Sequence, residues 1–198
     1  TVSFLAPAQD EQCTVTTNRK RAMELIVAMN ATLQLVIPNQ VGVYDDAFNL
    51  NCVGDTFQSL NTPTILFEAG HYANDYARDT TRKYIYMALL QSLDYIALNS
   101  IEGLNYQPYF DIPQNDKCFY DIIIRKAFID SGKNDSYGDI GLLYQEILKD
   151  GVIHFIPKVE KIGDLGSFFG HKEIHAKGQQ VLNTENKHLE VDSEDVVV

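Results

Sequence analysis

Positive charge is scarce in this sequence of 198 residues, which contains 16 lysines and arginines against 27 aspartates and glutamates. The formal net charge at pH 7 is therefore −11. Nucleic acids and anionic membranes are bound through clusters of basic side chains, and the sequence has no basic stripe. We therefore expect neither nucleic acid nor a membrane among the partners of this chain.

Cysteines and long hydrophobic runs are equally few. No apolar run approaches the roughly 20 residues that a membrane-spanning helix needs. Cys13, Cys52 and Cys118 are odd in number and far apart, which is not the pattern of a disulfide framework. This cysteine usage favours a reducing compartment, so we expect a cytoplasmic protein.

Residues 63–72, Pro-Thr-Ile-Leu-Phe-Glu-Ala-Gly-His-Tyr, form the most informative stretch. The first five predict a short strand that is buried on both faces, and the strand is expected to stop at Glu68. Catalytic groups in open α/β sheets gather at the carboxyl ends of strands. Glu68 is therefore a candidate catalytic residue, although a loop glutamate, or one paired with Arg78 or Arg82, would give the same pattern.

The chain before this stretch predicts a buried strand at residues 2–5, which begins directly after Thr1. We interpret this start as a piece of a longer domain. A helix is expected from Thr17 or Asn18, either of which can cap it, until Pro38 stops the pattern. Residues 39–62 predict a long irregular loop, and we interpret it as packed because it carries several large apolar side chains.

A second helix is expected over residues 79–98, where Asp79 or Thr80 can cap it. Its apolar stripe consists of Ile85, Leu89, Leu93 and Ile96. After a linker-like segment, short strands are predicted at residues 119–125, 138–144 and 152–156, with Asp150-Gly151 as a tight hairpin turn.

Two segments together resemble one bacterial branch of the zinc metallocarboxypeptidases of the carboxypeptidase A type. They are residues 41–49, Val-Gly-Val-Tyr-Asp-Asp-Ala-Phe-Asn, and residues 67–72, Phe-Glu-Ala-Gly-His-Tyr, and the resemblance covers roughly residues 1–98. It implies that Glu68 is the general base at the end of a buried strand. It also implies that Tyr44, which lies 68 − 44 = 24 positions earlier, is a mobile substrate-binding tyrosine.

His71 follows Glu68 by three positions, so it can contact substrate or cap the following turn, and we include it as a substrate-binding candidate. A second histidine pair, His171 and His175, has H-x-x-x-H spacing. That spacing would suit a metal on a helix. The flanking Gly170 and Gly178 and the strand-like alternation at Ile174 favour a strand instead.

The resemblance implies zinc as the cofactor, but the H-x-x-E ligand pattern of this family is not present. None of the five histidines is followed three positions later by Glu or Asp. We therefore expect the zinc ligands upstream of Thr1, in a missing N-terminal half of the same domain that would be a partner of this chain. The later segments 121–125, 139–141, 150–153 and 173–178 resemble the small β-sandwich that flanks amidohydrolase barrels.

These observations predict an α/β fold class. Residues 1–105 would form the C-terminal half of a carboxypeptidase-like mixed-sheet domain, residues 114–182 a small all-β domain, and residues 183–198 an acidic tail. The predicted function is zinc-dependent, carboxypeptidase-type hydrolysis of peptide bonds, with this chain inactive alone. The alternatives are an N-acyl amino acid deacylase of the same superfamily and a non-catalytic binding or structural fragment, so the expected substrate is a peptide or an N-acyl amino acid.

Overall fold

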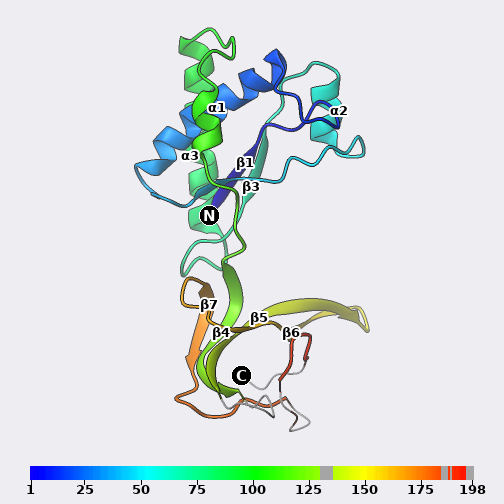
Figure 1. Cartoon of the computed structure of the whole chain (residues 1–198), viewed down its shortest axis with the longest axis vertical. Coiled ribbons are helices and arrows are strands. Elements are labelled where there is room, and N and C mark those ends of the chain that lie inside the picture. The colour runs from blue at the N-terminus through cyan, green and yellow to red at the C-terminus, as the bar shows by residue number, and fades with distance from the viewer. Residues whose placement is uncertain (130–135, 184–186, 188, 195–198) are drawn as a thin grey trace. The chain divides into compact units, whose positions relative to one another are not determined.

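The computed structural model describes residues 1–129, 136–183, 187 and 189–194, and the chain divides into two compact units (Figure 1). The first unit is Thr1–Asp116 and the second is Lys117–Val198. Together they form a mixed α/β protein in which each unit contains one mixed sheet. The first unit therefore extends beyond residue 105, the end that the sequence suggested for it.

The sheet of the first unit has the strand order β2-β1-β3. Its central strand β1 (Val2–Leu5) is buried along its whole length and runs parallel to β2 (Val41–Val43) and antiparallel to β3 (Leu66–Ala69). Residues 113–115 extend the sheet beyond β2, because the backbone of Val43 donates to Pro113 and accepts from Asn115, both at 2.8 Å. This added segment is the reason that the first unit reaches Asp116.

Two long helices pack against this sheet, α1 (Thr17–Gln34) and α3 (Asp79–Leu98). Thr16 caps α1, because its side chain accepts a hydrogen bond from the backbone of Arg19. The apolar face of α1 lies in the core with β1. Its fully buried apolar side chains are Ala22, Met23, Ile26, Met29 and Leu33.

Several expectations for this unit were wrong. Strand β3 is half-buried, not covered on both faces, because it is the edge strand of the sheet, and it continues through Glu68 to Ala69. The segment 39–62 contains strand β2 and helix α2 (Val53–Ser59), not only loop, and Leu50 and Phe57 in it are exposed.

A further correction concerns the stripe of α3. Leu89, Leu93 and Ile96 are 43%, 60% and 48% exposed, whereas the helix buries Thr81, Ala88 and Ser92. Small side chains on the buried face let α3 pack closely against α1. A short 3₁₀ helix, η1 (Gln107–Asp111), then leads to the segment at the sheet edge.

The second unit has a four-stranded sheet of order β6-β5-β4-β7, built from β4 (Phe119–Ile129), β5 (Ser136–Lys149), β6 (Val152–Gly163) and β7 (Phe169–His175). Strand β7 is parallel to β4, whereas the other pairs are antiparallel. The turn predicted at Asp150-Gly151 is confirmed, and both residues have positive φ, as a type I′ hairpin turn requires. Buried side chains of β4 and β5, with Val159 and Leu189, form the core on one face of this sheet.

Among the described residues, no helix combines the length and the apolar character needed to cross a membrane. The last valines of the tail lie outside the described residues.

Candidate functional site

Glu68 projects from strand β3 on the side opposite its apolar neighbour Phe67. Phe67 packs edge-to-face against Phe4, with ring centroids 5.2 Å apart, inside the helix-covered core. Because successive side chains of a strand point to opposite faces, Glu68 lies on the other face of the sheet. There it is paired in register with Ser3 of β1. The carboxylate is therefore part of a sheet face and does not stand alone beyond a strand end.

Two polar side chains accompany Glu68 on this face, and the sequence did not single out either of them. Ser3, between Glu68 and Gly42 in the register, donates from its hydroxyl to the side-chain oxygen of Asn115 at 2.8 Å. A Cβ on Gly42 would lie 3.0 Å from the Cα of Asn115, so a glycine there lets the 113–115 segment approach the sheet. The signal in the sequence for these polar side chains was Ser3, the one polar residue within the apolar strand Val2-Ser3-Phe4-Leu5.

Tyr44 lies on the opposite side of β1 from Glu68. Its backbone donates to the carbonyl of Phe4 at 2.9 Å, which extends the β1–β2 pairing by one residue, and its side chain is 40% exposed. Strand spacing places the Cα atoms of Tyr44 and Glu68 roughly 12 Å apart. Tyr44 and Glu68 therefore lie on either side of β1. Because β3 is antiparallel to β1, the carboxyl end of β3 lies beside the amino end of β1.

His71 lies in the segment that connects β3 to α3, beside Arg78. The His71 Nε2 atom is 3.5 Å from Nη2 of Arg78, and the other terminal nitrogen of this guanidinium, Nη1, donates to the carbonyl of Ala69 at 3.2 Å. Arg78 has a left-handed backbone, with φ of 60°. Arg78 and Arg82 thus contact Ala69 and Asp79, not the Glu68 carboxylate that the sequence left as a possible partner.

Asp75 fixes the end of the same connection. Its carboxylate accepts hydrogen bonds from the backbone of Thr80 at 3.0 Å and of Thr81 at 2.9 Å, so it caps α3 from outside the helix. Burial raises the pKa of Asp75, but these hydrogen bonds outweigh burial and hold the pKa below its ordinary value. The expected caps, Asp79 and Thr80, are instead the first two residues of the helix.

The other histidine pair lies on a strand, as its flanking sequence indicated. His171 and His175 both belong to β7, and positions four apart on a strand are separated by roughly 13 Å. The ring of His171 lies tilted against that of Phe119, with ring centroids 5.8 Å apart, and His175 accepts from the backbone of Lys177 at 3.1 Å. The pair is therefore too far apart to bind one metal ion together.

The residues around Glu68 do not supply a zinc site. Across the part of the chain that the structure describes, there is no group of three or more His, Cys, Asp or Glu that could hold a metal ion. Zinc sites in hydrolases need three protein ligands. The Glu68 face instead offers one carboxylate, a serine hydroxyl and an amide, a set that can accept a proton and orient a polar group.

Comparisons with models of protein families, with curated proteins and with solved structures found no match. The chemical role of the Glu68 face is therefore inferred from Glu68, Ser3 and Asn115 themselves.

Proposed function

We propose that the first unit contributes the general base and part of the substrate site to a zinc-dependent, carboxypeptidase-type hydrolase of peptide bonds. The observation that carries the proposal is the position of Glu68. It lies on a polar row of an α/β sheet, next to Ser3 and Asn115, with Tyr44 on the other side of the same central strand.

In this proposal Glu68 accepts a proton from the attacking water and returns it to the leaving amine. Tyr44 reaches the substrate by movement of its exposed loop, and His71 contacts the substrate from the connection after β3. The proposal places the zinc ligands in further polypeptide of the same domain, and the described residues by themselves contain no group of three ligands.

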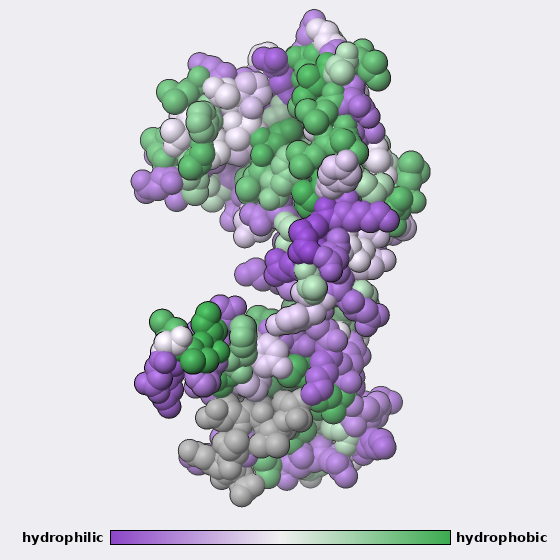
Figure 2. Space-filling model, turned by 180° about the vertical axis from the view of Figure 1, so that it is seen from behind, coloured by the Kyte–Doolittle hydropathy of each residue, from purple (hydrophilic) through white to green (hydrophobic). Residues whose placement is uncertain are grey.

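The exposed apolar surface of the first unit supports a role as part of a larger assembly. Leu89, Leu93 and Ile96 of α3 and Val53 and Phe57 of α2 are all more than two-fifths exposed. Figure 2 shows hydrophobic residues gathered in bands on this unit. Apolar surface of this extent is typical of a face that packs against further protein.

The test compares the chain alone with a longer polypeptide that includes the sequence encoded upstream of Thr1. We expect hydrolysis of C-terminal residues from peptides only by the longer form. In that form Glu68→Gln should lower kcat by roughly 10²- to 10⁴-fold, the usual contribution of a general base, with zinc content unchanged.

Glu11→Gln is the matched control, because Glu11 is exposed in the loop before α1 and should leave activity unchanged. A longer form that stays active after Glu68→Gln would refute the proposed role. Activity on N-acyl amino acids but not on peptides would show that the enzyme is a deacylase.

A further inference from the structure

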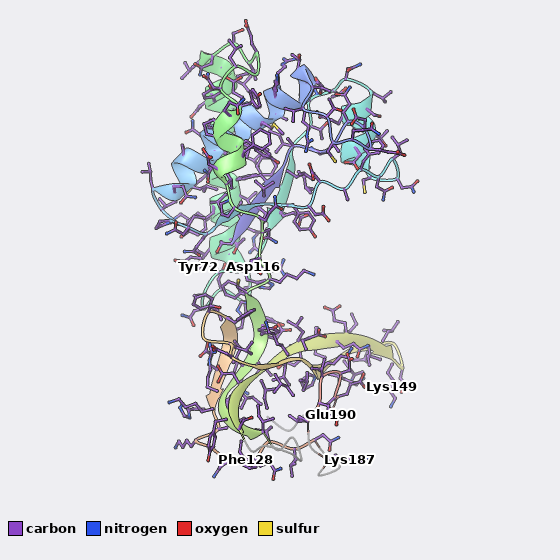
Figure 3. The ribbon with its side chains drawn as sticks, in the orientation of Figure 1. Tyr72, Asp116, Phe128, Lys149, Lys187 and Glu190 are labelled. Carbon is purple, nitrogen blue, oxygen red and sulfur yellow. The ribbon has the colours of Figure 1, made fainter. Side chains whose placement is uncertain are left out.

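Strands β5 and β6 continue beyond the rest of their sheet as a two-stranded ribbon. Strand β4 is paired with β5 only as far as Leu142, whereas β5 and β6 remain paired from Leu143–Lys158 to Lys149–Val152. Figure 3 labels Lys149 at the tip of this ribbon, and Figure 2 shows hydrophobic residues gathered on it. A two-stranded ribbon is marginally stable on its own in water.

Four side chains near the tip are large and apolar and lie outside both cores of the unit. Leu148, Val152, Ile153 and Phe155 are 73%, 58%, 54% and 55% exposed. Leu148 is opposite Ile153 in the register, and Phe155 follows on the same face, with its ring 6.2 Å from that of Tyr144. The ribbon thus carries an apolar surface that the described residues of its own unit leave largely exposed.

The outer edge of β6 is covered at one end and open at the other. At Val159 the backbone donates to Ser193 at 2.9 Å and accepts from Asp192 at 2.8 Å, so these groups of Val159 face away from β5. Outward groups alternate along an antiparallel strand, so those of Ile153 and Phe155 face the same way. No described residue pairs with the outward groups of residues 152–157, which therefore present an open strand edge, a template for another strand.

We propose that this open edge pairs antiparallel with the same edge of a second copy of the chain, about a two-fold axis at His154. In that register Ile153 of one copy lies opposite Phe155 of the other, and each such pair exchanges two backbone hydrogen bonds. The outward donor and acceptor of Ile153 then pair with those of Phe155 in the other copy, and those of Phe155 pair with Ile153. The proposal does not depend on the catalytic role of the first unit.

Charge favours a second copy as the occupant. The chain carries a net charge of −11, which opposes self-association over most of its surface. Residues 152–157, Val-Ile-His-Phe-Ile-Pro, contain no Asp, Glu, Lys or Arg, so two such edges meet without that repulsion. The apolar face that carries Ile153 and Phe155 would continue across the axis. An edge of six residues from each copy is small beside the roughly 20–30 residues a side of a stable interface. We therefore expect a dimer that dissociates on dilution.

The position of His154 on the axis allows a charge-swap experiment. Each His154 lies opposite its own copy in a non-hydrogen-bonded pair, where Cα atoms are about 4.5 Å apart and like charges are unfavourable. His154 is exposed, so its replacement should leave the fold intact. Sedimentation velocity should show wild-type dimers, at least tenfold weaker association for His154→Glu and for His154→Lys, and restored dimers in an equimolar mixture of the two variants.

Gln145→Glu and Gln145→Lys provide matched controls, because Gln145 is an exposed residue on the same face of the ribbon but in the inner strand β5. These variants should dimerise as the wild type does, and circular dichroism should show that all variants are folded. A wild-type chain that is monomeric up to about 100 µM would overturn the proposal. It would equally be overturned if both His154 variants kept full association, or if their mixture stayed monomeric.

Discussion

Glu24, on α1, is a buried carboxylate that connects three parts of the first unit. The side chain of Glu24 accepts hydrogen bonds from the backbone of Gly103 at 2.7 Å, from the Tyr95 hydroxyl at 3.1 Å and from the Asn105 amide at 3.2 Å. Burial raises the pKa of Tyr95, and its hydrogen bond to Glu24 raises it further. One charged residue thus joins α1, α3 and the connection that follows α3.

Replacing Glu24 with glutamine should destabilise the first unit by about 1–3 kcal/mol, because the amide cannot accept from all three donors and leaves a buried group unpaired. Urea unfolding at pH 7 measures the effect. Glu11→Gln, at an exposed position, should change the free energy of unfolding by less than about 0.5 kcal/mol. Equal stability of the two variants would show that the Glu24 contacts do not matter for folding.

Helix α3 shows how an element can be predicted correctly while its buried face is not. Residues 79–98 form the expected helix, but apolar residues lie on both of its faces, and periodicity does not tell which face is covered. Tyr84 and Ile85 pack on the core of the first unit, whereas Leu89 and Leu93 are exposed.

Substitutions on the two faces of α3 should therefore differ in their effects in this chain. Leu93→Lys should change the free energy of unfolding by less than about 0.5 kcal/mol, since the side chain is exposed. Ala88→Leu should destabilise by about 1–3 kcal/mol, because Ala88 is fully buried and the added atoms overpack the core. Thermal unfolding distinguishes the two, and a large loss with Leu93→Lys would mean that the inferred buried face is wrong.

The other elements could be predicted where the residues that specify them lie close together in the sequence. Strand β1, helix α1 and the Asp150-Gly151 turn follow from runs, caps and turn residues that lie within a few positions of one another. Strand β2 has only three residues and gives no periodic signal. The sequence could not predict that Ser3 and Asn115 lie together beside Glu68, because they are 112 positions apart and only the folded sheet brings them into contact.

Across the whole molecule, the second unit has its own core and its own charge network, centred on Arg125. The guanidinium donates to Asp139 and Glu173, each at 2.9 Å, and to the carbonyls of Leu165 and Phe168, each at 2.7 Å. The hydrogen bond to Glu173 raises the pKa of Arg125 and lowers that of Glu173. Burial raises the pKa of Asp139, but hydrogen bonds from Lys126 and Arg125 outweigh it and lower the pKa overall.

These lowered pKa values make the stability of the second unit sensitive to acid. A carboxylate with a depressed pKa stabilises the fold above its unfolded-state pKa of about 4, and the stabilisation is lost as pH falls through the folded-state value. Arg125→Met should cost about 3 kcal/mol at pH 7 and should flatten the decline in melting temperature between about pH 5 and pH 2. Calorimetry across this range measures both effects, and an unchanged pH slope would contradict this account.

The strand-like pairing of residues 113–115 with β2 has a practical consequence for anyone who wishes to produce the two units separately. Cleaving the polypeptide near residue 105 would strip the sheet of its outermost segment and remove Asn115 from Ser3. A junction after Asp116 keeps that segment in place and still leaves β4 whole, since this strand begins at Phe119. To produce the two units separately, the chain should therefore be divided at the peptide bond between Asp116 and Lys117.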